Sequence, residues 1–303
     1  MRENIQIRAV FAFAMLLGAL GMPAAAQQQG AGSWGAVEAA LGRKGAMQPG
    51  GVMKFGFPRS DLHVTVDGVT LKPALALGGW VAFRAIGNGR SMAMGDLVLT
   101  EDEVGAVMAA LQANGVQQTA LHNHLLRESP RIMYMHVFAE GDGVKIARAI
   151  HDALAKSRTP LEGAPAPAAP AVADLDTAAI AKALGVAGKL NGVVYQVSVP
   201  RREQITEMGH DVPASMGVAS GMNFQPTGGG KAAITGDLVL RASEVNTVIR
   251  ALHAHGIEVT AVHSHMLDEQ PRLFFMHFWA NDNAARLAKG LRAALDLTGS
   301  KKR

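Results

Sequence analysis

The stretch from Thr119 to Phe138 reads TALHNHLLRESPRIMYMHVF and contains three histidines. Apolar residues alternate with other residues on both of its arms and a proline lies between them, so it predicts a β-hairpin that turns around Glu128 to Arg131. His122 and His124 are two residues apart and should point to the same face of one strand. In such a hairpin, His136 on the returning strand lies opposite or beside His124, with Cβ atoms about 5 Å apart. The three imidazoles then converge, which suits a divalent transition metal with an open fourth position.

The same pattern occurs a second time, because Thr260 to Trp279 reads TAVHSHMLDEQPRLFFMHFW. Each histidine of the first stretch has a counterpart 141 residues later, and neighbouring core and turn residues repeat as well. This agreement indicates a duplicated domain with one three-histidine site in each copy, for which zinc is the expected ion. The predicted metal ligands are His122, His124, His136, His263, His265 and His277.

The alternatives to metal ligation by the histidine triplets are a hydrogen-bonded structural cluster and a pH-responsive cluster. Aromatic residues on the same hairpin face predict partly apolar surroundings, which favour the neutral imidazole that binds metal. His63 offers the first half a fourth imidazole, whereas the second half has Ile205 at the aligned position. Because His63 lies in a poorly patterned region, we expect it to be a surface residue.

Charged residues flank the turn of each predicted hairpin. Glu128 and Arg131 lie in the first turn, and Glu269 and Arg272 lie in the second. As catalytic candidates, the glutamates would act as general bases or as partners behind the metal ligands, and the arginines would hold an anionic group of a substrate. The alternative is a surface ion pair in each turn, worth about 0 to 1 kcal/mol.

Both halves follow one predicted order of helix, strands, helix, hairpin and helix. Segregated elements of this kind predict an α+β fold in which each copy is a mostly antiparallel sheet with helices packed on it. Asp96 and Asp237 fall near the predicted passage from strand to helix, which favours a turn or capping role over ligation. The predicted helices cover 34–41, 100–114, 142–155 and 175–184, and the predicted strands before the first hairpin cover 52–57, 64–69, 80–86 and 91–99.

The chain divides into a signal segment, two domains and a linker. The predicted first domain covers 33–158, an Ala/Pro-rich linker covers 159–173, and the second domain covers 174–297. Because the linker offers little apolar surface, we expect the two halves to fold independently after cleavage within it.

The first 26 residues have the pattern of a secretory signal peptide. Basic residues precede an apolar run from Ala9 to Leu20, and Ala24 to Ala26 provides an A-x-A cleavage motif. A run of about a dozen residues is too short to span a bilayer comfortably, so cleavage is predicted in preference to a membrane anchor. We therefore expect a periplasmic or secreted protein without stable membrane insertion after cleavage.

Composition excludes several classes of protein and site. The chain has 303 residues and no cysteine, so disulfides, thiolate metal sites and a lipid-modified cysteine are not expected. Its formal net charge is +4, of which Lys301 to Arg303 supply three positive charges. Since no basic stripe with interleaved aromatic residues occurs, nucleic acid is not an expected partner. An envelope ligand or another small molecule is the expected partner class.

The repeated signature resembles a bacterial family called domain of unknown function 1259, which includes the LppY and LpqO lipoproteins of mycobacteria. The resemblance extends from about Trp34 to Leu297 and implies no activity. Without a cysteine, this chain should not be anchored as those lipoproteins are. In the first half the signature comprises Gly95 to Leu99 (GDLVL), Glu103-Val104, Thr119 to His124 (TALHNH), Glu128 to Arg131 (ESPR) and Met135-His136.

Two function classes follow from the sequence. One is a protein that binds a divalent transition metal, or an envelope ligand without metal, and performs no turnover. The other is a metal-dependent hydrolase of a cell-envelope substrate, which would use a metal-bound water of pKa about 7. No G-x-S-x-G, H-E-x-x-H or P-loop motif occurs, so the sequence favours neither class.

Overall fold

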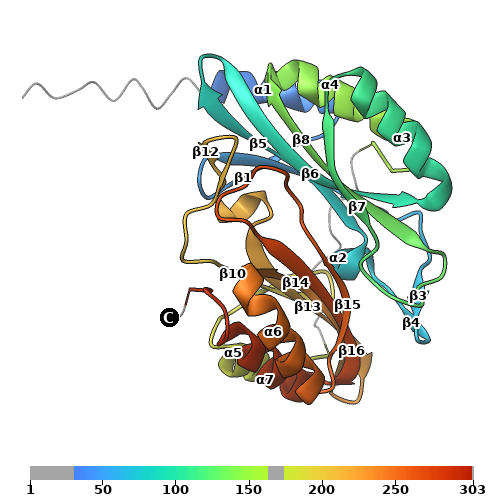
Figure 1. Cartoon of the computed structure of the whole chain (residues 1–303). Helices are drawn as coiled ribbons and strands as arrows, with labels where there is room; N and C mark the ends of the chain where they lie inside the picture. The colour runs from blue at the N-terminus through green and yellow to red at the C-terminus, as the bar shows by residue number, and fades with distance from the viewer. Residues whose placement is uncertain (1–30, 163–173, 302–303) are drawn as a thin grey trace, which may run out of the picture.

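A computed structural model describes residues 31–162 and 174–301, so the predicted signal peptide and most of the predicted linker lie outside the described residues. Two six-stranded antiparallel sheets are stacked face to face, and helices cover the outer side of each sheet (Figure 1). The prediction of an α+β fold, with two similar halves that each carry helices on a mostly antiparallel sheet, is confirmed. The stacking of the two sheets was not predicted.

The first half contains one sheet of strand order β1-β2-β5-β6-β8-β7. The large helices α1, α3 and α4 lie on its outer face (Figure 1). Its helices are α1 (Ala31–Leu41), α2 (Pro73–Ala76), α3 (Glu101–Ala113) and α4 (Gly143–Leu154). Its strands are β1 (Ala46–Gln48), β2 (Val52–Pro58), β3 (Thr65–Val66), β4 (Val69–Thr70), β5 (Gly78–Gly87), β6 (Arg90–Thr100), β7 (Gln117–His122) and β8 (Ile132–Gly141).

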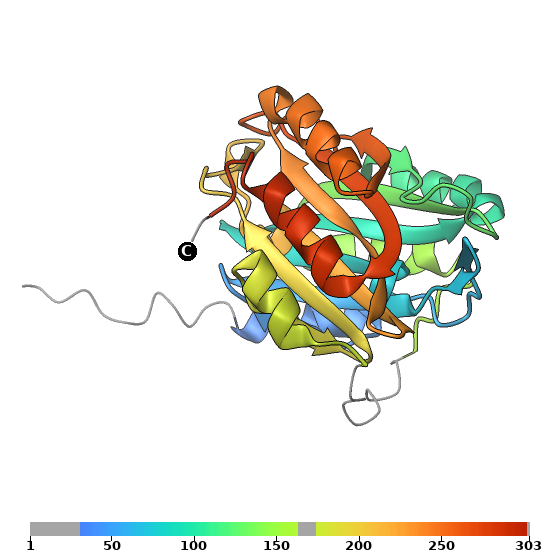
Figure 2. The same cartoon turned by 90° about the horizontal axis from the view of Figure 1, so that it is seen from below.

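The second half repeats this arrangement with strand order β15-β16-β14-β13-β10-β9. Seen from below, its helices cover the outer face of its sheet, and the first half lies behind (Figure 2). Its helices are α5 (Thr177–Leu184), the 3-10 helix η2 (Ala214–Met216), α6 (Ala242–Ala254) and α7 (Ala284–Leu295). Its strands are β9 (Lys189–Asn191), β10 (Val194–Pro200), β11 (Thr206–Glu207), β12 (His210–Asp211), β13 (Ala219–Gly228), β14 (Lys231–Leu240), β15 (Glu258–His263) and β16 (Phe274–Asn283).

Local sequence explains where several elements begin and end. The Glu103 carboxylate accepts a hydrogen bond from the Thr100 N–H at 2.9 Å, which fixes the start of α3 as the capping pattern predicted. Asp142 accepts hydrogen bonds from two N–H groups in the first turn of α4. The predicted strand over 64–69 is wrong, because Asp67 and Gly68 adopt positive φ and divide that segment into β3 and β4.

The outer face of each sheet packs against the helices of its own half and forms a separate hydrophobic core. In the first half, Phe55, Phe83 and Leu97 of the sheet meet Leu111 of α3 and Ile150 of α4. Corresponding strands and helices of the second half form a similar core of their own. The alternation along the strands therefore leaves every second side chain free to face the other half.

The inner faces of the two sheets form a shared interior. Each half sends out an arm that packs on the sheet of the other half, and these arms cover 59–77 and 201–218. In the first arm, Leu71 and Leu75 share a buried cluster with Ala233 and Trp279 of the second half. In the second arm, Ile205, Val212 and Met216 share a buried cluster with Met92 and Phe138 of the first half. The expectation that the halves are self-sufficient units therefore does not fit this structure, because each buries apolar surface on the other.

Candidate functional site: six histidines between the sheets

The two hairpins place their histidines in equivalent positions. His122 is the last residue of β7, and His124 lies two residues beyond it in the connection to β8. His136 lies in the middle of β8, where it pairs with Ala120 of β7 on one side and with Asp96 of β6 on the other. His136 is therefore not paired with His124, because β7 ends before His124 and the hairpin connection is longer than predicted.

The six predicted ligands meet in one cluster at the interface of the two halves. His122 stacks on His263, with ring centroids 3.5 Å apart. His124 stacks on His277 and His136 stacks on His265, each with a separation of 3.7 Å. Every close stack thus joins one histidine of the first half to one of the second. The two hairpins therefore bring the ligands of both repeats into contact.

One ring nitrogen of each histidine has no hydrogen-bond partner in the part of the chain that the structure describes. The Nε2 atom of all six imidazoles is buried and makes no hydrogen bond to any described residue. Where the other ring nitrogen, Nδ1, has a hydrogen-bond partner, that partner is a backbone carbonyl. The Nδ1 atom of His277, for example, lies 2.8 Å from Gly236 O. This arrangement orients the ring and leaves Nε2 available as a ligand.

Ligand atoms of the cluster are close enough to share metal ions. One group takes three histidines from the second half and His122 from the first, and the other takes all three from the first half. Within each group the possible ligand atoms lie within 4.8 Å of one another. His122 belongs to both groups and therefore links the two halves of the cluster. The two groups are His122, His263, His265 and His277, and His122, His124 and His136.

Burial keeps these imidazoles neutral. Desolvation lowers the pKa of His122 to about 3 and that of His263 to about 4. The pKa values of the other four, which are more deeply buried, lie well below the ordinary value for the same reason. Neutral imidazole is the form that coordinates metal, so the electrostatics of the cluster suit ligation.

Two aspartates lie beside the cluster, and the sequence had favoured a turn or capping role for them. Asp96 lies in β6 with its carboxylate oxygens 3.8 Å from His136 Nε2 and 4.0 Å from His124 Nε2. Asp237 in β14 lies 3.4 Å from His265 Nε2. Desolvation raises the pKa of Asp96 to about 7 and that of Asp237 well above its ordinary value. A repeated carboxylate inside a strand of apolar residues was the sequence signal for this placement.

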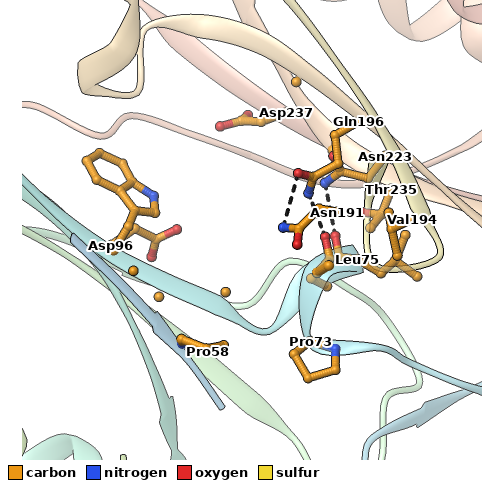
Figure 3. Close-up of a pocket in the computed structure, with 18 of the residues that line it drawn as sticks. Pro58, Pro73, Leu75, Asp96, Asn191, Val194, Gln196, Asn223, Thr235 and Asp237 are labelled. Atoms are coloured by element: carbon orange, nitrogen blue, oxygen red, sulfur yellow. Dashed lines mark hydrogen bonds between the residues drawn. The ribbon is translucent and has the colours of Figure 1, made fainter. Parts of the chain in front are cut away.

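A cavity of about 780 Å³ lies beside the cluster. Four of the histidines and both aspartates line it, together with residues of α2. Figure 3 shows Asp96 and Asp237 across the open space from one another, each carried by its own sheet. The cavity size is typical of sites for small molecules, and a ligand in it would contact the four histidines that line it.

The remaining polar groups of the cavity come unequally from the two halves. On the second-half side, Gln196 and Asn223 donate hydrogen bonds to the carbonyls of Ala74 and Leu75 in α2, at 2.8 and 3.0 Å (Figure 3). On the first-half side, the Lys54 ammonium lies over the Trp80 ring at 3.9 Å from its centre. Burial lowers the pKa of Lys54 to about 8.

The predicted catalytic pairs lie away from the cavity. Glu128 and Glu269 accept hydrogen bonds from the N–H groups four residues later, at 3.1 and 2.9 Å, and so hold the hairpin connections in shape. Arg131 is exposed with Glu101 at 3.9 Å, and Arg272 pairs with Glu269 at 3.2 Å. None of the four is among the residues that line the cavity, so their catalytic role stays a prediction without support from position.

His63 is exposed and belongs to neither ligand group, as expected for a surface residue. Its neighbour Asp61 instead accepts a hydrogen bond at 2.8 Å from Arg59, a fully buried arginine that also pairs with Glu103. The first half therefore gains no fourth ligand from this segment. The difference between the halves lies in the cavity wall.

The described part of the chain contains no helix that is long and apolar enough to span a membrane. The predicted signal peptide lies outside that part.

A family model described as Domain of Unknown Function (DUF1259) matches residues 35–156 and 178–297. The chain therefore belongs to this family and carries two copies of its domain, as the repeated signature predicted. A search of curated proteins finds no match.

Two solved structures are similar over much of their length. One is a trimeric bacterial microcompartment shell protein, PduB, with 14% identity over 83% of this chain and 91% of that chain, and a TM-score of 0.21. The other is EtuB from Clostridium kluyveri, with 11% identity over 84% and 91% and a TM-score of 0.19. At these TM-scores neither likeness bears on the function of this chain.

Proposed function

We propose that this two-domain chain is an exported protein that binds divalent transition metal, with zinc as the expected ion, between its two halves. The observation that carries the proposal is the set of six clustered imidazoles whose buried Nε2 atoms have no hydrogen-bond partner among the described residues. Leaving one buried polar group unsatisfied costs about 1 to 3 kcal/mol, so six in one place call for a ligand.

The donor set supports a transition metal over a hard cation. Six imidazole nitrogens and two nearby carboxylates suit zinc, copper, iron or nickel, whereas calcium and magnesium prefer oxygen ligands. Since no cysteine or thioether is among the cluster residues, nothing in the donor set selects copper(I). Each histidine offers one ligand atom, so the six together provide for up to two ions per chain, and His122 can bind only one of them at a time.

A purely structural cluster or a pH-responsive one fits less well. In a structural cluster the ring nitrogens would hydrogen-bond to each other or to carbonyls, yet the Nε2 atoms do neither within the described residues. In a pH-responsive cluster protonation would be reached under mild acid, but the pKa of His122 lies near 3. Metal binding satisfies the Nε2 atoms without protonation.

The test is metal content of the mature protein after reconstitution with zinc, measured by mass spectrometry. Wild-type protein should retain up to two ions per chain, and the double variant His124→Ala/His265→Ala should lose them. The matched control His63→Ala/His151→Ala removes two histidines outside the cluster and should keep the wild-type content. Full zinc stoichiometry in the cluster variant would contradict the proposal.

Hydrolysis is a second candidate function, favoured by the cavity that reaches the cluster and by the placement of Asp96 and Asp237. A metal ion in this site would act as a Lewis acid on an oxygen of a bound molecule. Asp96, with a pKa of about 7, could accept or donate a proton near neutral pH. A screen of holo and metal-stripped protein against ester, phosphoester and amide substrates tests this, and turnover that survives metal removal would exclude it.

Export is supported by the N-terminal sequence pattern alone. Protein recovered from the periplasm or medium should begin at Gln27 by N-terminal sequencing, and retention of residues 1–26 would contradict cleavage.

A further inference from the structure

We infer that the cavity binds a small anionic molecule, whose carboxylate or phosphate group lies between the histidine cluster and the ammonium of Lys54. This inference rests on the proposed metal site and adds the chemical class of its ligand. It depends on three features of the cavity wall: an ammonium with no carboxylate within ion-pair distance among the described residues, the positive charge that bound metal would add, and open space at two glycines.

Lys54 has no carboxylate within ion-pair distance among the described residues. Its ammonium lies on the Trp80 ring and donates one hydrogen bond, to the Ser215 carbonyl at 3.2 Å. An ammonium group has three donors, so at least one remains for a ligand after the Ser215 carbonyl and the Trp80 ring are counted. A half-buried cation on a cavity wall, with a donor to spare, is a recognition group for an anion.

The charge balance of the cavity points the same way. The charged side chains that line it are Lys54, Lys72, Asp96 and Asp237, which cancel when all are ionised. The histidines are neutral and add no charge. Each divalent ion adds two positive charges, so the metal-loaded cavity is positive whether the aspartates are ionised or protonated. An anion entering this site is attracted by metal and ammonium together.

Two glycines in strand interiors keep the cavity open. Gly56 of β2 and Gly221 of β13 both line it, and a Cβ added to either would meet nothing within 4 Å. Gly221 aligns with Trp80 of the first half, so the second half leaves empty the volume that the first half fills with an indole. Glycine inside a strand weakens the strand, and here it leaves room for a ligand to approach the backbone.

The unequal walls place the anion on the first-half side. Gln196 is the counterpart of Lys54, and its amide donates to the Ala74 carbonyl of α2. Asn223 likewise donates to the Leu75 carbonyl. These amides hold α2 in place, whereas the Lys54 ammonium retains a free donor. Of the two lysines that line the cavity, Lys72 is exposed, so the half-buried Lys54 beside Trp80 is the cation that we assign to the anionic group.

Phenylphosphonate is a suitable probe, because it offers a phosphonate for Lys54 and metal and a ring for the apolar wall. Zinc-loaded wild-type protein should bind it in isothermal titration calorimetry, and neutral benzyl alcohol should not bind measurably. Lys54→Gln, which introduces the residue found at the aligned position, should weaken binding about tenfold or more. The control Lys145→Gln removes an exposed lysine of α4 and should bind as wild type.

Gly221→Leu is a second variant, and it leaves the charge of the cavity wall unchanged. It should fill part of the open volume and abolish binding of phenylphosphonate while zinc content stays at the wild-type value. Circular dichroism and zinc content should be measured on every variant to identify any that fail to fold. Lys54→Gln and Gly221→Leu then test the anion site independently of one another.

Several outcomes would overturn the anion site. They are equal affinity in Lys54→Gln and wild type, equal affinity in Gly221→Leu and wild type, binding of benzyl alcohol as tight as that of phenylphosphonate, or no binding by zinc-loaded wild type. In each case zinc is bound and the proposed metal site stands. If wild-type protein takes up no zinc, the proposed function fails and the anion site fails with it.

Discussion

The two halves carry the same histidine hairpin but build unlike walls around it. His122, His124 and His136 have direct counterparts in the second half, and the two sets meet in pairs across the interface. Lys54 and Trp80, by contrast, are replaced by Gln196 and Gly221. Duplication thus supplies the matched ligands of a shared cluster. Residue differences outside the hairpins give the cavity beside it a different wall on each side.

A second difference lies directly behind the histidines. Tyr134 stacks under His124 at 3.3 Å, and its counterpart Phe275 stacks under His265 at 3.5 Å. Both rings are fully buried. Only Tyr134 has a hydroxyl, and it donates to the Ala76 carbonyl of α2 at 3.0 Å. The first hairpin is therefore tied to the arm that crosses to the other half.

Removing one half of the chain should have the largest effect on stability. A chain of residues 174–303 should lose cooperative unfolding, because Val239, Met266 and Phe275 would exchange a buried interface for water. Thermal unfolding followed by near-ultraviolet circular dichroism measures this. The full chain cut within 163–173 is the control, and its halves should remain associated in size-exclusion chromatography. A cooperative transition in the isolated half would contradict the shared interior.

Truncation of the ring behind the second-half histidines should have the next largest effect. Phe275→Ala leaves a cavity beneath His265 and should lower the free energy of unfolding by about 3 to 5 kcal/mol. Urea denaturation measures the change. Leu297→Ala, at an exposed position, should stay within about 0.5 kcal/mol of wild type. A loss below about 1 kcal/mol for Phe275→Ala would show that the ring is not packed beneath His265.

The smallest effect is expected where the halves differ by one hydroxyl. Tyr134→Phe makes the first half resemble the second at this position and removes the hydrogen bond to Ala76, which should cost about 1 kcal/mol of unfolding free energy. Zinc content should not change, because the ring under His124 is kept. Urea denaturation with parallel metal analysis tests both expectations. An unchanged free energy of unfolding would mean that the hydrogen bond from Tyr134 to Ala76 does not stabilise the fold.

Sequence reasoning predicted the duplicated α+β fold, because periodicity and capping residues act locally. The capping pair Thr100 and Glu103 fixed α3, and the alternation in β8 fixed which residues share a face with His136. The strand over 64–69 was wrong because Asp67 and Gly68 form a turn there. That misplaced segment belongs to an arm, whose conformation depends on the other half.

The candidate ligands could be identified from the sequence, but their grouping could not. Spacing within one hairpin brings three histidines together, whereas the stacking of His122 on His263 depends on how two sheets pack. Asp96 was missed for another reason: it meets His136 and His124 of its own half because β6 pairs with β8, a pairing that the sequence analysis did not assign. Long-range packing of duplicated units was the missing information for the grouping of the ligands.

The central claim is that the six histidines form one site shared by both halves, and His122 tests it most directly because it belongs to both ligand groups. Zinc affinity of His122→Ala should be measured by competition with a chromophoric chelator, beside wild type and the His63→Ala control. A shared site predicts weaker binding of zinc by the second-half histidines as well, since His122 belongs to their ligand group. If the second-half histidines retain an ion at wild-type affinity in His122→Ala, the sites are independent and the claim of a shared site is wrong.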